Sequence, residues 1–252
     1  MTGVQSDYHV VVMGKTGSGK SATCNRLLGS NEFTVYRGMT GRTETVQRET
    51  VFEEHTRLHV IDTPDVFNLT MDEGTAIQEF RKWENYVTTG RVAFLLTVRL
   101  DVRFTPTDYN MYKRYRSFLP RNLRDNIVLA FTRVHDLEGD ILDEVKLSTV
   151  NDLLKDARGR HVTFSKSDRN TSESGQNKDK IMNWMREMPQ TADGPLQRSS
   201  SMTDIQLTMS RARRSASYPD LRSSDPHAGN WLQSIVHFFG AVRDYLRSWF
   251  YN

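Results

Sequence analysis

One motif restricts the fold of this 252-residue chain more than any other feature. Residues 14–21 read GKTGSGKS, which has the form G-x-x-x-x-G-K-[ST]. The motif follows the apolar run of residues 10–13 and precedes the helix-like run of residues 22–28, as a phosphate-binding loop requires. Its glycines permit torsions that turn successive N–H groups toward an anion, and the following helix adds its partial positive charge. The motif therefore predicts a nucleoside triphosphate site.

The residue types in this loop indicate their roles. Lys20 is expected to reach the β- and γ-phosphate oxygens, and the Ser21 hydroxyl is expected to bind Mg²⁺. A glycine-rich turn matched by chance is the alternative, and it does not explain the strand before the loop or the helix after it. The expected nucleotide contacts of the loop are Gly14, Lys15, Thr16, Gly17, Ser18, Gly19, Lys20, Ser21 and Ala22.

Apolar strand-like runs alternate with helix-like runs along the chain. Strands are expected over residues 8–13, 50–53, 57–61, 92–98, 127–131 and 161–164, and helices over 72–87, 107–119, 143–156 and 178–188. This alternation predicts an α/β fold whose mostly parallel sheet is flanked by helices. Ligands of such a sheet bind at the carboxyl ends of its strands, where the glycine-rich loop lies. A single cysteine, Cys24, excludes a disulfide framework and is expected to be a packed small residue.

Composition divides the chain into three expected parts. Residues 7–190 form the nucleotide-binding domain. Residues 191–228 are rich in Ser and Arg, which predicts a disordered linker. Within it, a segment of the form R-S-x-S-x-P resembles a 14-3-3 ligand when Ser217 is phosphorylated, and a solvated linker is the alternative. Residues 229–252 are expected to form an amphipathic helix.

Charge and the N-terminal sequence restrict partners and location. The chain has 34 basic and 31 acidic residues, a near balance that indicates a solvated surface and no nucleic-acid partner. Residues 1–10 lack the apolar core of a secretory signal peptide, so a cytoplasmic location is expected.

Three further positions are expected to serve Mg²⁺ and the terminal phosphate. Asp62 ends a strand-like run and is the candidate to hold Mg²⁺ through water. Asp65 stands where GTPases place a glycine whose N–H meets the γ-phosphate, and a carboxylate there is electrostatically costly. In the polar stretch of residues 37–45, Thr40 is the first candidate to ligate Mg²⁺ and Thr43 the second. An ordinary polar loop explains either threonine equally well.

The segment after the fifth strand-like run is the expected place for reading the base. There, Arg133, His135 and Asp136 stand close together in the sequence. A carboxylate accepts two hydrogen bonds from guanine that adenine cannot supply, and unpaired buried groups then reject the wrong base. Selectivity falls to Asp136 or to an acceptor nitrogen of His135. Ser165 and Lys166 occupy the last expected base-contact position.

Three stretches together carry a family resemblance: GKTGSGKSATCNRLLG, IDTPDVFN and FTRVHDLEG. They resemble the GIMAP family, also called AIG1-type or IAN GTPases, over roughly residues 7–188. The resemblance implies a P-loop GTPase fold of the septin- and Toc-like branch, and binding of GTP or GDP with Mg²⁺. It also implies a homodimer, or a heterodimer with related GTPases, formed across the nucleotide face. The resemblance further implies a location in the cytosol or on an organelle surface and, as in many members, a role in lymphocyte survival or immune defence.

Hydrolysis is expected to be slow without assistance. Val66 stands where a glutamine would orient water, and a valine side chain cannot do so. Arg103 matches the family's GRYT-like segment and is the candidate for an arginine finger that acts across a dimer; a surface arginine is the alternative. The runner-up function is a nucleotide-binding scaffold that has lost hydrolysis, as the DTPD and RVHD motifs indicate.

The C-terminal segment carries a membrane signal. At about 100° per residue, the apolar and aromatic side chains of residues 231–250 fall on one helix face. Arg243, Asp244 and Arg247 make spanning unfavourable, by about 2.5–3.5 kcal/mol each near the bilayer centre. A helix lying in the membrane interface fits better, and a helix packed on the domain or on a partner is the alternative. Peripheral association with an intracellular membrane is therefore expected.

Overall fold

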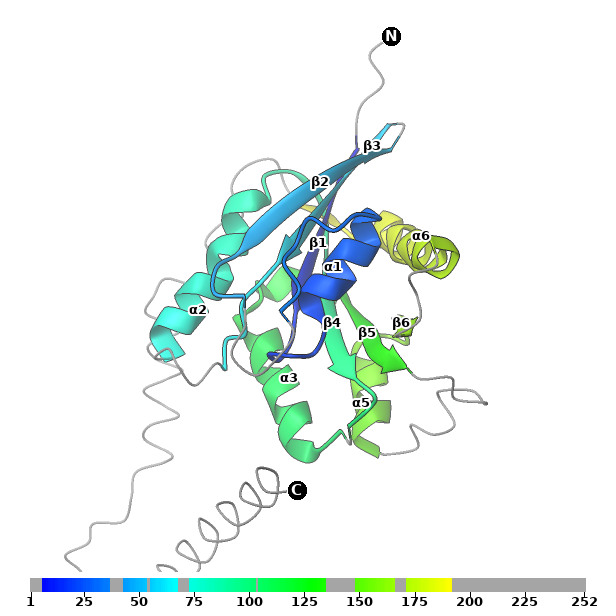
Figure 1. Ribbon diagram of the computed structural model, residues 1–252. Coiled ribbons are helices and arrows are strands. Elements are labelled where there is room, and N and C mark those ends of the chain that lie inside the picture. Colours follow the sequence, from blue (N-terminus) through cyan, green and yellow to red (C-terminus); the bar gives the residue numbers. More distant parts are fainter. Residues whose placement is uncertain are drawn as a thin grey trace, which may run out of the picture. The chain divides into compact units, whose positions relative to one another are not determined.

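The computed structural model describes residues 6–36, 43–53, 55–67, 73–102, 104–134, 148–165 and 171–191 (Figure 1). The chain divides into two compact units, residues 1–199 and 200–252, and the described residues belong to the first. The predicted linker beyond Thr191, with Ser217, and the predicted C-terminal helix lie outside the described residues, so their boundaries stay predictions. In the part of the chain that is described, no helix combines the length and the apolar character needed to cross a membrane.

The strands of the described residues form one sheet, in the order β2-β3-β1-β4-β5-β6, with β7 paired to β4. Parallel pairing joins β3, β1, β4, β5 and β6, whereas β2 and β7 are antiparallel to their neighbours. Their bounds are β1 Ser6–Met13, β2 Gln47–Glu53, β3 Thr56–Asp62, β4 Gly90–Arg99, β5 Ile127–Val134, β6 His161–Ser165 and β7 Gln190–Thr191. The register pairs Val12 with Asp62 and Met13 with Leu96, so three strand ends meet beside the glycine-rich loop.

Alternation along the central strands builds a core on each face of the sheet. On β1, Val10 and Val12 belong to one core, and Val11 and Met13 belong to the other. Helices α1 and α6 cover the first core, and α2, α3 and α5 cover the second (Figure 1). The helices are α1 Lys20–Leu28, α2 Glu73–Arg81, α3 Pro106–Phe118, α5 Ser148–Asp156 and α6 Thr171–Glu187, with short 3₁₀ helices at Lys82–Tyr86 and Arg121–Leu123. The predicted fold class, a mostly parallel sheet flanked by helices, is therefore confirmed.

Two predicted helices differ from the observed ones. The α-helix expected over residues 72–87 ends at Arg81 and continues as a 3₁₀ helix. Trp83 in this tighter segment is fully buried and packs edge-on against Phe94, with ring centroids 5.1 Å apart. The helix expected from residue 178 begins at Thr171 instead. Its first turns are polar, and Asn177 donates a 2.6 Å hydrogen bond to the carbonyl oxygen of Thr163, a contact that no apolar period signals.

Cys24 lies on α1, fully buried, with a free thiol. Burial raises the pKa of this thiol well above its usual value. The prediction of a packed small residue is confirmed, because a neutral buried thiol is a poor nucleophile.

Candidate nucleotide-binding site

The loop between β1 and α1 depends on glycine torsions. Gly14, Gly17 and Gly19 have φ angles of 145°, 76° and 95°, all in the region that L side chains rarely adopt. A Cβ atom on Gly14 would lie 2.4 Å from Oγ1 of Thr97 and 2.8 Å from the Thr97 carbonyl oxygen. Close approach of β4 therefore excludes any side chain at Gly14. The motif requires glycine at this position for a steric reason.

Two threonines of the sheet hold this loop in place. Thr97 of β4 donates to the carbonyl oxygen of Met13 at 3.1 Å, and its Oγ1 lies 2.5 Å from Oγ of Ser18. Because Thr97 has one hydroxyl proton, Ser18 is the donor of the second bond. Thr132 of β5 donates to the carbonyl oxygen of Ser18 at 2.7 Å. Sequence reasoning missed both threonines, although each is a hydroxyl near the end of an otherwise apolar run.

Lys20 folds back over the loop from the first residue of α1. Its Nζ donates to the carbonyl oxygens of Gly14 at 2.9 Å and Lys15 at 3.1 Å. Burial lowers the pKa of Lys20, and the nearby carboxylates of Asp62 and Asp65 act in the opposite direction. The ammonium group is thus held at the centre of the loop, where the motif requires a group for the β- and γ-phosphates.

Helix α1 begins directly at this loop. Gly19 is its N-cap in the left-handed conformation, and within the described residues no side chain caps the helix or adds an acidic group to its first turn. Ser21 and Ala22 follow in that first turn, whose N–H groups have no partners inside the helix. Such a start is suited to an anion.

Three oxygen-bearing side chains meet beside Lys20. The Ser21 hydroxyl donates to Oδ2 of Asp62 at 2.6 Å, and the Thr43 hydroxyl donates to the same oxygen at 3.1 Å. The two hydroxyl oxygens lie 3.2 Å apart. Oδ1 of Asp62 is buried without a hydrogen-bond partner. Burial raises the pKa of Asp62, and the hydrogen bond from Ser21 and the charge of Lys20 oppose this.

This donor set fits Mg²⁺. The ion prefers oxygen ligands and usually takes one or two protein groups together with phosphate oxygens and waters. In the described segments, no three side chains of the His, Cys, Asp or Glu types gather as a metal cage. Thr40, the first predicted ligand, lies outside the described residues and stays a prediction. The second candidate, Thr43, lies beside Ser21 and Asp62.

Asp65 is a buried residue, 8% exposed, and its carboxylate is turned toward the loop. Its Oδ2 accepts from the N–H of Thr16 at 2.7 Å and from the Thr16 hydroxyl at 3.1 Å. Its Oδ1 accepts from the N–H of Phe67 at 2.9 Å and from the Tyr115 hydroxyl of α3 at 2.8 Å. Val66, between Asp65 and Phe67, is buried in the core and not directed at the phosphate side. Tyr115 is a contact that sequence reasoning missed.

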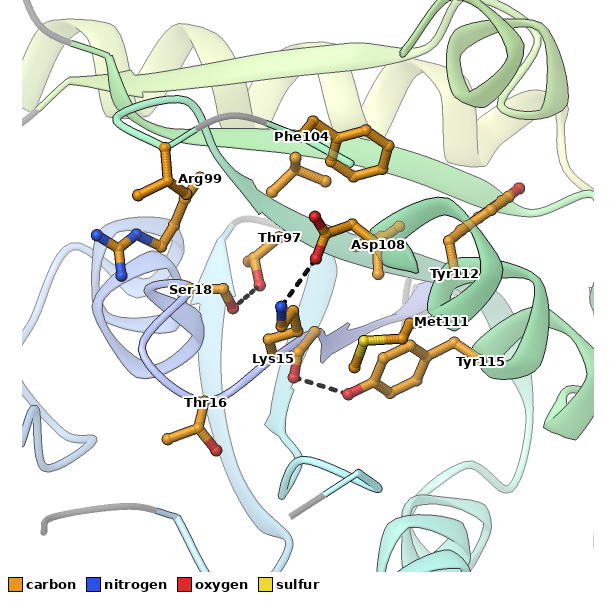
Figure 2. A pocket seen from close by; sticks show the side chains of 14 residues that line it. Lys15, Thr16, Ser18, Thr97, Arg99, Phe104, Asp108, Met111, Tyr112 and Tyr115 are labelled. Carbon is orange, nitrogen blue, oxygen red and sulfur yellow. Dashed lines mark hydrogen bonds and ion pairs between the residues drawn. The ribbon is translucent and has the colours of Figure 1, made fainter. Parts of the chain in front are cut away.

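The side chain of Lys15 points away from the loop toward α3 (Figure 2). Its Nζ forms a 2.8 Å ion pair with Oδ1 of Asp108, and the capping box between Thr105 and Asp108 fixes the start of that helix. A pocket of about 180 Å³ lies here between the loop, β4 and α3, with Phe104 and Met111 in its apolar lining. Lys15 therefore lines the loop with its backbone, and its side chain lies elsewhere.

The predicted base-reading end is described only in part. Arg133 has a φ of 57° at a shift in the β5–β6 register, and its Nη1 lies 3.3 Å from Oδ2 of Asp101. Ser165 ends β6, and its carbonyl oxygen accepts a 2.8 Å hydrogen bond from Arg26 of α1. Four predicted residues lie outside the described residues: Arg103, His135, Asp136 and Lys166.

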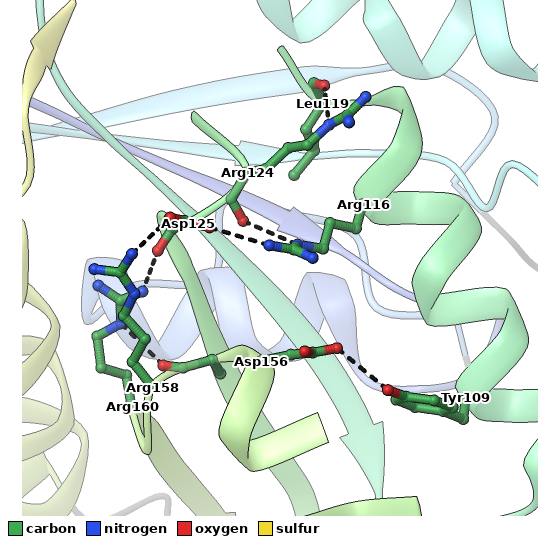
Figure 3. A network of polar contacts seen from close by, with 9 residues as sticks. Tyr109, Arg116, Leu119, Arg124, Asp125, Asp156, Arg158 and Arg160 are labelled. Atoms are coloured by element: carbon green, nitrogen blue, oxygen red, sulfur yellow. Dashed lines mark hydrogen bonds and ion pairs between the residues drawn. The ribbon is translucent and has the colours of Figure 1, made fainter. Parts of the chain in front are cut away.

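A cluster of ion pairs, centred on Asp125 and separate from the phosphate loop, lies near the start of β5 (Figure 3). Asp125 pairs with Arg116 at 3.0 Å and with Arg158 at 2.6 Å, and Arg160 donates to its carbonyl oxygen. These pairs join α3 and the α5–β6 connection to β5. They are half exposed, so each contributes about 0–1 kcal/mol and has a structural role.

The geometry of the loop and the fold agree with what a comparison of sequences shows. A family model described as the AIG1 family matches residues 8–216. The chain belongs to the AIG1 family. The predicted resemblance to AIG1-type proteins is therefore confirmed.

Curated relatives of this AIG1-family chain come from plants and mammals. Immune-associated nucleotide-binding protein 7 of Arabidopsis thaliana is 30% identical over 147 residues, which are 58% of this chain and 45% of that protein. GTPase IMAP family member 8 of Homo sapiens is 28% identical over 162 residues, which are 64% of this chain and 24% of that protein. The chain thus matches less than half of the length of either relative.

Solved structures with this fold include two P-loop GTPases. Toc33 from Arabidopsis thaliana, in complex with GDP and Mg²⁺, aligns with a TM-score of 0.53 at 16% identity, over 72% of this chain and 86% of Toc33. Era from Aquifex aeolicus, bound to GDP and aluminium fluoride, aligns with a TM-score of 0.51 at 14% identity, over 73% of this chain and 58% of Era. At these identities the likeness establishes the fold of the family member.

Proposed function

We propose that this AIG1-family chain binds GTP and GDP together with Mg²⁺. The observation that carries the proposal is the arrangement of Lys20 within the glycine-rich loop beside Ser21, Asp62 and Thr43. Lys20 and the start of α1 would hold the phosphates, and Ser21 with Asp62 would hold the Mg²⁺ that neutralises them. Toc33, which has the same fold, is known in complex with GDP and Mg²⁺ and with GMPPNP.

The bound nucleotide is proposed to control dimerisation at a membrane surface. Dimerisation is described as important for the GTPase activity of the chloroplast translocon components Toc33 and Toc159, which supports this part by analogy of fold. The amphipathic pattern of residues 229–252 supplies the membrane contact. Names of the curated relatives refer to immune association, so a role in immune defence or cell survival is proposed with it.

Hydrolysis is proposed to be slow in the monomer. The residue after Asp65 is Val66, whose side chain lies in the hydrophobic core, so no water-orienting group stands there. The same observation favours the second candidate function, a nucleotide-binding scaffold without useful hydrolysis. The two candidate functions differ in Arg103: only the GTPase would use this residue, supplied by the second subunit of a dimer, to accelerate hydrolysis.

Calorimetric titration with GTP, GDP and ATP tests the central proposal. Binding of both guanine nucleotides, weakened by EDTA and at least tenfold tighter than ATP, is the expected result. The Lys20→Ala variant is the matched control, because it removes the phosphate-binding charge and leaves every residue of the sheet unchanged. Equal affinity for ATP and GTP would refute guanine selection, and no binding of any nucleotide would refute the assigned site.

A further inference from the structure

One buried carboxylate connects the phosphate loop, the segment after β3, and helix α3. Asp65 accepts from Thr16 of the loop at 2.7 Å, from Phe67 of its own segment at 2.9 Å and from Tyr115 of α3 at 2.8 Å. Tyr115 points from α3 toward the loop (Figure 2). Its hydroxyl also lies 2.9 Å from the carbonyl oxygen of Gly14, so its one proton is shared between this oxygen and Oδ1 of Asp65. The backbone N–H of Thr16 donates to one oxygen of the carboxylate and the backbone N–H of Phe67 donates to the other, so each oxygen serves as an acceptor.

These contacts hold the carboxylate of Asp65 in one position. Burial raises the pKa of Tyr115 well above its usual value, and the charge of Asp65 adds to this effect. The hydroxyl therefore keeps its proton and stays a donor. For the carboxylate to turn away, it would have to leave both the loop and α3, and a buried unpaired donor costs about 1–3 kcal/mol.

The charge lies on the side of the site that serves the terminal phosphate. Asp65 follows Asp62 by three positions, and both carboxylates act on the buried ammonium of Lys20. Lys20 thus already has two carboxylates as neighbours. A triphosphate brings more negative charge to this end of the loop than a diphosphate does, and hydrogen-bond dipoles do not cancel a full charge.

We propose that Asp65, held by Thr16 and Tyr115, is a specificity-determining residue that shifts the site's preference from the nucleoside triphosphate toward the diphosphate. The inference rests on the proposed function, because it takes Lys20 and the loop as the phosphate site. Repulsion between the fixed carboxylate and the terminal phosphate lowers triphosphate affinity and leaves the diphosphate largely unaffected, since like charges at short range are costly in a buried site.

The test is the ratio of two affinities measured on one protein preparation. Dissociation constants for GDP and for GMPPNP, a non-hydrolysable triphosphate, are determined by calorimetry with excess Mg²⁺ for the wild type, Asp65→Asn and Asp65→Gly. Both variants should raise triphosphate affinity relative to diphosphate affinity about tenfold, which corresponds to about 1.4 kcal/mol. A partly unfolded variant lowers both apparent affinities by the same factor, so the ratio remains informative.

Asp108→Asn is the matched control. Asp108 is another carboxylate next to the loop, but its partner is the exposed Lys15 and its place is in the pocket beside α3. The ratio of triphosphate to diphosphate affinity in Asp108→Asn should stay within twofold of the wild-type value. If both Asp65 variants bind GDP with an unchanged or lowered ratio, the inference is overturned and the proposed function stands. If the wild type binds neither nucleotide, both are overturned.

Discussion

Ser21 donates a 2.6 Å hydrogen bond from its hydroxyl to Oδ2 of Asp62, 41 residues further along the chain. The bond joins the first turn of α1 to the end of β3, and it exists because the parallel β1–β3 register brings Asp62 level with Val12. The other carboxylate oxygen of Asp62 is buried without a partner. A change at either residue is therefore expected to act on Mg²⁺ and the phosphates.

Lys20→Ala and Ser21→Asn should each weaken triphosphate binding. Loss of the Lys20 ammonium removes charge-assisted hydrogen bonds worth about 1.5–3 kcal/mol, a weakening of roughly 10–100-fold. Ser21→Asn removes a Mg²⁺ ligand, so its defect should depend on Mg²⁺. Fluorescent GTP titration with and without EDTA measures both. Unchanged GTP affinity in both variants would show that the nucleotide binds elsewhere.

Thr43→Val should raise the Mg²⁺ concentration needed for half-maximal triphosphate binding by about three- to tenfold. The substitution keeps the shape of the side chain but removes the hydroxyl that lies 3.1 Å from Asp62, a hydrogen bond to a charged group. Thr45→Val is the matched control, because Thr45 is exposed two residues later. A Mg²⁺ dependence of Thr43→Val equal to that of the control would exclude Thr43 from the cation site.

GTP turnover per molecule should rise with protein concentration, and Arg103→Ala should abolish the rise. An arginine that reaches the phosphates of a partner subunit acts only in the dimer, and such residues accelerate hydrolysis by about 10³–10⁵-fold in well-studied cases. Phosphate release measured over a concentration series is the assay, with Arg158→Ala as a control, since Arg158 pairs with Asp125 near the start of β5. A wild-type rate independent of concentration would favour the scaffold.

Acid should destabilise the domain through His9. Burial, followed by the charge of His59, lowers the pKa of His9 from 6.5 to about 4, although its bond to the Thr89 carbonyl oxygen and the charge of Asp7 oppose this. The unfolded chain binds the proton more tightly, so the free energy of unfolding falls as pH drops from 6.5 toward 4. The loss is up to ~3 kcal/mol.

Urea denaturation of the wild type and of His9→Val at several pH values between 7 and 4.5 measures this loss. The variant should be less stable at pH 7, because it loses the hydrogen bond to Thr89, but its stability should fall less on acidification. His55→Val, at an exposed position between β2 and β3, is the control. An equally steep fall in His9→Val would assign the acid sensitivity to other groups.

Deletion of residues 229–252 should release the protein from membranes to the cytosol. Phe238→Asp combined with Val242→Asp should have the same effect without shortening the chain, because both charges would lie on the apolar face of the predicted helix. Carbonate extraction should remove the wild-type protein, as expected for a helix in the interface. Resistance to carbonate would indicate insertion, and failure to bind liposomes would make the helix a packing or partner element.

The phosphate loop and the end of β3 could be predicted because short stretches of sequence signal them: the loop by its glycine and lysine spacing, and Asp62 by its place after an apolar run. The approach of Thr97 to Gly14 and the contact of Asp62 with Ser21 are long-range, and only the structure shows them. The position of Thr43 beside Asp62 could not be predicted locally. It depends on β2, which begins by pairing Gln47 with Asp62 and so brings the preceding residues near that carboxylate.

The contact between Tyr115 and Asp65 could not be predicted for a related reason. The two residues are 50 positions apart and meet only because α3 packs across the end of β4 and the loop. Nothing in the period of α3 distinguishes Tyr115 from an ordinary core tyrosine. The polar first turns of α6 could not be predicted because their buried side chains, Ser174 and Asn177, are polar and give no apolar spacing. Asn177 is held by its hydrogen bond to Thr163.

The two threonine hydroxyls that hold Ser18 make the phosphate loop part of the sheet. Local opening of the loop would require breaking bonds to both β4 and β5, two interior strands of the sheet. The Ser18 amide, bonded to the carbonyl oxygen of Lys15, should therefore exchange its hydrogen with solvent about as slowly as the central strands do. Amide hydrogens in surface loops usually exchange fast. The slow Ser18 amide would therefore report on global unfolding from within a loop.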